Sequence, residues 1–273
     1  MIGSAALTFV SLLSPHLHGF YAELLDHLSH RLGLELRLVH PDWQDARRAV
    51  EVATVDGAFQ CGLILQQHRA FVPVAAPVPL GQREAIYTTQ VVVRREYPAR
   101  LFEDLAAARW VCNDPSSLSG CAALYAHASR LDLPPGFFGS PFWSGGHLAS
   151  LDAVASGQAD AAGIDSTVYS AALRAHPELR QSLRVVTTLG PYPAPPLTLR
   201  RTLPQALRDE VQDAFLKVRS NASGQALLHQ AGFSRFLPVN AATYAPLQGE
   251  ADLAARWRAT GPTLAGPRRS AHV

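Results

Sequence analysis

The chain has 273 residues, of which 48% are hydrophobic and 17% are charged, and this composition excludes a disordered protein. The length allows one large domain or two lobes of ordinary size. A formal net charge of +2, with basic residues clustered only in pairs, argues against nucleic acid as a partner, and no apolar run reaches the ~18 residues of a transmembrane helix.

The first third of the chain alternates strands with helices. Apolar residues recur at helical spacing between Gly19 and Arg31, and Gly33 is a typical end for that helix. With a strand at 5–12 before it and the alternating segment 34–39 after it, this helix predicts a β-α-β unit, the seed of a parallel sheet. The other elements expected in this part are a helix at 43–52 and strands at 55–61 and 70–79.

Strands and helices continue to alternate after a change of pattern near residues 81–89. The expected strands are 86–95, 109–113, 158–165 and 183–189. The expected helices are 101–107, one that ends near 131, 147–156, 167–175, 204–219, 221–231 and 249–259. Roughly the last dozen residues (262–273) show no periodicity, and we expect them to be frayed.

An internal echo links the two halves of the chain. The helix end Ala49-Val50 and the turn at 55–58 reappear as Ala153-Val154 and the turn at 159–162, each 104 residues later (49 to 153, 56 to 160). Two matches in one register indicate two lobes of similar α/β build, with strand ends aimed at a ligand crevice. Within these turns, Asp56 and Asp160 are expected to satisfy local backbone groups rather than to act in catalysis.

The three cysteines, Cys61, Cys112 and Cys121, form neither a CxxC motif nor a zinc-ligand spacing. We therefore expect no metal site and no disulfide framework, and we interpret all three as small buried apolar residues. A Cys112–Cys121 bridge is conceivable, but the turn and helix predicted between the two residues argue against it.

The segment NDPSSLSG at 113–120 is the most informative motif of the chain. Pro115 suits the first turn of a helix, where its missing N–H would be unpaired anyway. The serines at 116, 117 and 119 are good partners for the remaining free amides. Those amides, together with the positive end of the helix dipole, form a seat for an anion. The alternative is that these serines only cap the helix.

Two further polar residues follow this segment at the ends of elements. His147 comes directly after Ser144-Gly145-Gly146, which permits close approach of the backbone to a ligand. Asp165 ends a predicted strand. The alternatives are that His147 only caps or packs at its helix start and that Asp165 is the N-cap of the next helix.

The chain resembles the substrate-binding components of phosphate, phosphite and phosphonate ABC transporters over roughly residues 5–245. The resemblance is carried by VDGAFQCG at 55–62, NDPSSLSG at 113–120, SGGHLASLDAV at 144–154 and ADAAGIDS at 159–166. It implies the α/β type II periplasmic-binding-protein fold, with two lobes, each a mostly parallel sheet flanked by helices, joined by two hinge strands near 86–91 and 185–191. Lobe one would comprise 1–85 plus 187–273, and lobe two would comprise 86–186.

The resemblance also implies ligand-binding residues. The oxyanion would be held by the turn that contains Ser116, Ser117 and Ser119, and by His147. Leu118 departs from the many relatives that carry a hydroxyl at this position. The remaining candidates are Asp165, which can receive a ligand amine, Tyr87 and Thr88 at the hinge, and Cys61 and His16. For Cys61 the alternative is a buried filler, and for His16 a solvated loop.

The implied function is non-enzymatic capture of a small anionic or zwitterionic solute between the lobes, for an ABC transporter permease, by a monomer without cofactors or membrane insertion. The sequence carries no hydrolase, P-loop, zinc-protease or dinucleotide motif. The alternatives are an intracellular ligand sensor, or an enzyme on this fold that uses Cys61 and His147. The resemblance implies a periplasmic protein. The segment SAALTFVSLL lacks the flanks of a signal peptide, so a cytoplasmic location stays open.

Overall fold

The computed structural model describes residues 6–39 and 42–260, so the frayed end expected at 262–273 lies outside the described residues. The chain divides into two compact units. Of the described residues, the first unit comprises 6–39, 42–86 and 193–246, and the second comprises 87–192 and 247–260. No helix among the described residues is both long and apolar enough to cross a membrane.

The first unit is built on a six-stranded sheet of order β11-β4-β10-β3-β1-β2. Its strands are β1 (Leu7–Ser11), β2 (Leu36–Leu38), β3 (Gly57–Phe59), β4 (Phe71–Pro79), β10 (Leu197–Arg200) and β11 (Phe233–Pro238). β1 lies parallel between β2 and β3, whereas β10 runs antiparallel to β3 and β4. The helices are α1 (His18–Leu32), α2 (Trp43–Glu51), α3 (Gly62–Gln67), α8 (Gln205–Leu216), α9 (Ala222–Gln230) and α10 (Ala241–Tyr244).

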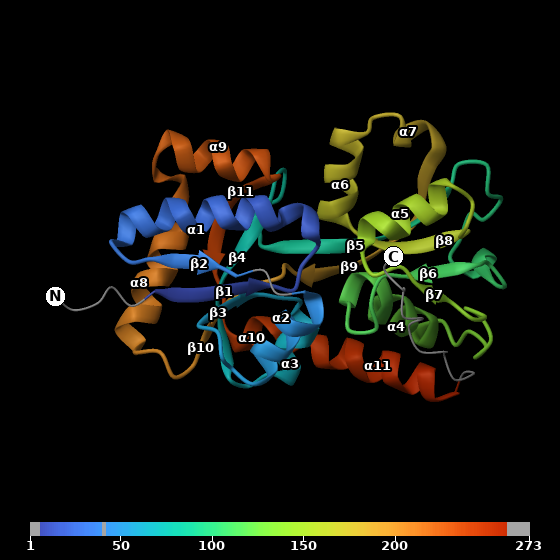
Figure 1. Ribbon diagram of the computed structural model, residues 1–273. Coiled ribbons are helices and arrows are strands. Elements are labelled where there is room, and N and C mark those ends of the chain that lie inside the picture. Colours follow the sequence, from blue (N-terminus) through green and yellow to red (C-terminus); the bar gives the residue numbers. More distant parts are fainter. Residues whose placement is uncertain (1–5, 40–41, 261–273) are drawn as a thin grey trace. The chain divides into compact units, whose positions relative to one another are not determined.

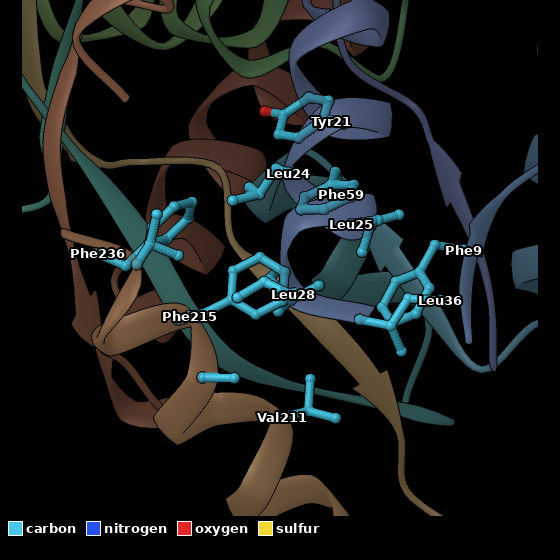
Figure 2. Close-up of a cluster of buried hydrophobic side chains, with 14 of the residues drawn as sticks. Phe9, Tyr21, Leu24, Leu25, Leu28, Leu36, Phe59, Val211, Phe215 and Phe236 are labelled. Atoms are coloured by element: carbon cyan, nitrogen blue, oxygen red, sulfur yellow. The ribbon is translucent and has the colours of Figure 1, made fainter. Parts of the chain in front are cut away.

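The core of the first unit forms where α1 and α8 meet the sheet (Figure 2). Tyr21 and Leu28 lie seven residues apart on one face of α1, and both are buried. The Tyr21 ring stacks on Phe59 of β3 with 3.9 Å between centroids, and Phe215 of α8 lies 6.2 Å from the same ring. Each such aromatic burial contributes about 1.5–3 kcal/mol, so this cluster fixes α1 and α8 on the sheet.

The second unit is built on a five-stranded sheet of order β7-β6-β8-β5-β9. Its strands are β5 (Ile86–Arg94), β6 (Trp110–Cys112), β7 (Phe142–Trp143), β8 (Ala161–Asp165) and β9 (Leu183–Pro193). Its helices are α4 (Ala123–Arg130), α5 (His147–Ala155), α6 (Ser166–Ala175), α7 (Leu179–Ser182) and α11 (Leu247–Thr260). Figure 1 shows α5 and α6 on one face of this sheet, and α4 with α11 on the other.

The two units repeat one arrangement, as the internal echo predicts. β6 lies parallel between β7 and β8, just as β1 lies between β2 and β3. The next strand in each sheet is antiparallel: β5 lies beside β8, and β10 lies beside β3. These findings confirm two units of similar α/β build, each with three parallel strands that end at one edge.

The aspartates of the echo brace the two units in the same way. Asp56 Oδ2 accepts a hydrogen bond from Thr8 N at 3.0 Å, and Asp160 Oδ2 accepts one from Arg109 N at 2.9 Å. Each acceptor thus holds the backbone where the central parallel strand of its unit begins. The expectation that both aspartates satisfy backbone groups is confirmed.

In each unit, an arginine on the antiparallel strand, β10 or β5, also binds the aspartate, and we call this aspartate–arginine contact the brace. Arg200 lies 2.6 Å from Asp56, and Arg94 lies 3.2 Å from Asp160. Asp160 also receives the Arg109 side chain, and these hydrogen bonds, led by that of Arg109, lower the pKa of Asp160 to about 2.

The C-terminal helix corrects one expectation. The resemblance places residues 187–273 as a whole in lobe one, yet α11 groups with the second unit. Glu250 of α11 pairs with Arg130 of α4, and the Arg258 guanidinium lies 4.7 Å from the centroid of the Tyr125 ring. Periodicity alone predicts that this helix exists but not which unit its apolar face covers.

Other differences concern short elements. The prediction of a helix at 101–107 is wrong, because this segment forms only a 3-10 turn at Glu103–Leu105. Asp104 Oδ2 accepts from the amides of Arg100 and Leu101, and Ala107 turns the chain with a φ of 62°. The α-helices and strands that the sequence did not predict are α3, β7, α7, β10, α10 and β11, all six residues or shorter.

We expect Asp160→Asn to lower the free energy of unfolding of the second unit by about 2 kcal/mol, since it removes a charged acceptor from two arginines and an amide. The loss should be complete above pH ~4 and should disappear as the pH falls through about 2, because the folded-state pKa lies below the unfolded one. Chemical denaturation at several pH values measures this difference. Asp152→Asn, at an exposed carboxylate of α5, is the control, and equal losses for both variants would contradict the brace.

Candidate functional site

Three strand ends bring the predicted site residues of the second unit to one edge. β6, β7 and β8 are parallel neighbours, so their carboxyl ends lie at the same edge of the sheet. The segment from Asn113 to Ala122 follows β6, His147 begins α5 after β7, and Asp165 ends β8. Residues that are far apart in the sequence therefore lie at one edge of the sheet.

Ser119 and His147 meet, as the sequence analysis expects. The Ser119 Oγ and His147 Nε2 atoms lie 3.2 Å apart, and Asn113 Nδ2 lies 3.3 Å from the same ring nitrogen. Because an amide nitrogen can only donate, the Nε2 atom is the acceptor in its contact with Asn113. All three side chains are at least nine-tenths buried, with exposed fractions of 3% for Ser119, 7% for His147 and 9% for Asn113.

Sequence reasoning missed Asn113 as a site residue. The signal was present, because Asn113 is the last residue of the predicted strand 109–113 and opens the motif NDPSSLSG. Its Oδ1 atom is buried and has no hydrogen-bond partner among the residues that the structure describes. Asn113 therefore combines a positioning contact to His147 with an unused acceptor.

The serines of the turn have different local roles. Ser117 is the N-cap, and its Oγ accepts from Gly120 N at 3.1 Å. Ser116 is engaged by Asp114, whose Oδ1 accepts from Ser116 N at 2.7 Å and also contacts its hydroxyl. Of the three serines, Ser119 is the one that meets His147.

The turn opens the helix in an unusual form. Residues Leu118–Ala122 form one π-helical turn in which Ala122 N donates to Ser117 O at 3.0 Å, and α4 continues from it. Wide turns of this type occur often at functional sites. The amides of Leu118 and Ser119 occupy the first positions of a helix, where no intrahelical acceptor exists, so they are available to an anion. Leu118 is fully buried and contributes its amide, not a hydroxyl.

Two glycines allow this turn to pack closely. A Cβ on Gly120 would lie 1.7 Å from Asn113 Oδ1, and a Cβ on Gly163 of β8 would lie 2.6 Å from Ser119 O. Both distances are far below normal contact, so the turn lies directly against the Asn113 side chain and against β8.

Asp165 acts as a helix cap within this edge. Its Oδ1 accepts from Thr167 N at 2.7 Å and from Thr167 Oγ1 at 2.6 Å. Burial raises the pKa of Asp165 and outweighs these hydrogen bonds. Thr89 pairs with Asp165 across β5 and β8, and its buried Oγ1 has no partner within the described ranges. The cap alternative is therefore observed, while a ligand contact of Asp165 stays a prediction.

The two hinge candidates on β5 differ in direction. Successive side chains of a strand point to opposite faces, so Tyr87 shares the face of Thr89 and Thr88 does not. Tyr87 is buried, with its ring 6.1 Å from that of Tyr192, whereas Thr88 Oγ1 accepts from Gln90. A ligand contact of Tyr87 or of Thr88 stays a prediction.

The candidates of the first unit lie at the corresponding edge of its own sheet. His16 follows β1 and Cys61 follows β3, its parallel neighbour. The His16 side chain is exposed, and its ring contacts Ser14 Oγ at 2.9 Å. Cys61 is 9% exposed at the N-cap of α3. A ligand contact of either residue stays a prediction.

The described residues contain no group of three or more His, Cys, Asp or Glu side chains that could hold a metal ion. Cys61 belongs to the first unit and His147 to the second. The His147 Nε2 atom is engaged by Ser119 and Asn113, and the edge offers hydrogen-bond donors for a negatively charged guest.

A family model matches most of the chain. It describes the periplasmic phosphonate substrate-binding protein of ABC transporters and aligns with residues 10–244. None of the curated protein sequences matches this chain.

Solved structures share the fold. The phosphonate transporter binding protein of Pseudomonas aeruginosa superposes with a TM-score of 0.83 at 19% identity, covering 96% of this chain and 91% of that one. PhnD1 of Prochlorococcus marinus, solved with methylphosphonate, gives 0.80 at 16% identity, with 90% and 97% covered. The aliphatic sulphonate-binding protein SsuA of Escherichia coli gives 0.66 at 18% identity, with 98% and 96% covered. The expected type II periplasmic-binding-protein fold is thereby confirmed.

We expect Gly120→Ala to displace the Asn113 side chain and break its contact with His147, because the new methyl group would overlap Asn113 Oδ1. The free energy of unfolding should fall by about 1–3 kcal/mol, as measured by chemical denaturation. Gly136→Ala, where a Cβ meets nothing within 4 Å, is the matched control. If both variants were as stable as the wild type, the close packing described here would be incorrect.

Proposed function

Since the chain belongs to the family of periplasmic phosphonate substrate-binding proteins of ABC transporters, we propose that it binds a small phosphonate or a related tetrahedral oxyanion. Members of this family bind solutes and are not enzymes. Methylphosphonate, which the Prochlorococcus relative holds in its structure, is the first ligand to test. We propose that the protein delivers its ligand in the periplasm, as a monomer, to the permease of an ABC transporter.

The observation that carries the proposal is the convergence of Ser119, Asn113 and His147 at the start of a helix. An oxyanion placed against this turn would accept from the amides of Leu118 and Ser119 and would gain from the helix dipole. A hydroxyl rotates freely, so Ser119 can redirect its proton from His147 to the anion. Hydrogen bonds to a charged group are about twice as strong as neutral ones.

We further propose that Asp165 extends the specificity to zwitterionic phosphonates. A ligand ammonium group would meet a buried carboxylate whose charge is disfavoured by desolvation. The ammonium would stabilise the ionised form. The Thr89 hydroxyl on the neighbouring strand has no partner within the part of the chain that the structure describes, and it would accept a further hydrogen bond from such a group.

We expect His147→Ala to weaken methylphosphonate binding by about 1–3 kcal/mol, because Ser119 and Asn113 lose the group that positions them. Isothermal titration calorimetry measures the change. His176→Ala, at an exposed histidine of the same unit, should bind like the wild type. Unchanged affinity in His147→Ala would remove the imidazole from the site.

The two serines should separate stability from binding. We expect Ser117→Ala to lower the free energy of unfolding by about 1 kcal/mol through the lost cap. Ser119→Ala should instead lower the affinity for methylphosphonate by about 1–2 kcal/mol. Denaturation and calorimetry on both variants test this division, and a result in which Ser117→Ala costs more affinity than Ser119→Ala would contradict it.

A further inference from the structure

Arg258 of helix α11 contacts the chain on both sides of the serines in the turn at residues 113–120, which we call the seryl turn. Its Nη2 atom donates to Pro115 O at 3.3 Å and to Cys121 Sγ at 2.9 Å. Pro115 precedes the three serines, and Cys121 lies after them in the π-helical turn Leu118–Ala122. One donor nitrogen therefore ties together two points of the chain that are six residues apart (115 to 121).

Aromatic packing holds this arginine in place. Its guanidinium lies 4.7 Å from the centroid of the Tyr125 ring of α4, and the neighbouring Trp257 stacks on the same ring with 5.2 Å between centroids. Nearer the start of α11, Glu250 pairs with Arg130 of α4. These residues and the seryl turn all belong to the second unit. A planar guanidinium can stack on a ring and donate in its own plane at the same time, whereas a lysine ammonium group has no plane to stack.

No carboxylate neutralises the charge of Arg258 within the described ranges. Across residues 6–39 and 42–260, no Asp or Glu forms an ion pair with this side chain, and its buried Nε atom has no hydrogen-bond partner. Because the side chain is half-buried, water and salt screen its charge less than that of an exposed arginine. A positive charge therefore lies against the turn whose first amides are the proposed seat of an oxyanion.

We propose that Arg258 is a positioning residue for the bound oxyanion. It fixes the seryl turn through Pro115 and Cys121, and each of these residues is three positions from Leu118, whose amide is a proposed donor to the anion. Its positive charge also stabilises the anion through the turn. The proposal rests on the proposed function, and it gives the C-terminal helix a part in ligand affinity.

The alternative is that Arg258 only anchors α11 to α4. An anchor of this kind would change the stability of the second unit but not the affinity of the folded protein for its ligand. Affinity and melting temperature measured on the same variants therefore separate the two roles.

The test uses the full chain and isothermal titration calorimetry with methylphosphonate on Arg258→Met, Arg258→Lys and Arg256→Met. Arg256 is exposed and lies on the same helix, so its substitution removes the same charge and is the matched control. We expect Arg258→Met to bind about ten-fold more weakly than the control, because it loses both the contacts and the charge. Arg258→Lys keeps the charge but loses the planar contacts, so its affinity should fall by only about three-fold.

A second measurement needs no ligand. Hydrogen–deuterium exchange with mass spectrometry follows the backbone amides of residues 116–122. These amides should exchange several-fold faster in Arg258→Met than in Arg256→Met, because the turn has lost its tie to α11.

The outcomes are distinct. Wild-type affinity in Arg258→Met, even with a lower melting temperature, would overturn the proposal, and so would unchanged exchange of residues 116–122. Equal losses of affinity in Arg258→Met and Arg258→Lys would overturn the contribution of the charge. If Arg258→Met did not fold, wild-type affinity in Arg258→Lys would overturn the proposal. A wild type that binds no methylphosphonate, with faster exchange in Arg258→Met, would count against the proposed function alone.

Discussion

The contact of His147 Nε2 with Ser119 and Asn113 holds together two strand ends and the helix turn between them. A buried polar group without a hydrogen-bond partner costs the folded state about 1–3 kcal/mol. This contact therefore fixes how closely the turn at residues 113–120 approaches the sheet. This close approach requires glycine at positions 120 and 163. A Cβ on Gly120 would overlap the Asn113 side chain, and a Cβ on Gly163 would overlap the Ser119 carbonyl oxygen. The amides of Leu118 and Ser119 come first in the helix and have no intrahelical acceptor, so an anion can accept hydrogen bonds from them.

A repeated scaffold supports this edge. In each unit an aspartate directly before the third parallel strand, β3 or β8, accepts a hydrogen bond from the backbone at the start of the central strand. An arginine on the strand antiparallel to β3 or β8 pairs with this aspartate. The brace lies at the opposite end of the strands from the site, where it sets their register. Variation of the loops at the carboxyl ends can then change the ligand without disturbing the sheet.

Much of this architecture could be predicted from the sequence, because it depends on periodicity and on turn residues. The long helices, the buried strands and the meeting of Ser119 with His147 follow from such local signals and from the family resemblance. The position of α11 could not be predicted, because the apolar face of a helix does not state which surface it covers. Asn113 was overlooked since its role depends on a partner 34 residues away.

The most direct test of the central claim is a crystal structure of the chain with methylphosphonate. The account predicts phosphonate oxygens within hydrogen-bond distance of Ser119 Oγ and of the amides of Leu118 and Ser119, with the His147–Asn113 contact retained. A phosphonate bound elsewhere, with Ser119 still engaged only by His147, would contradict it.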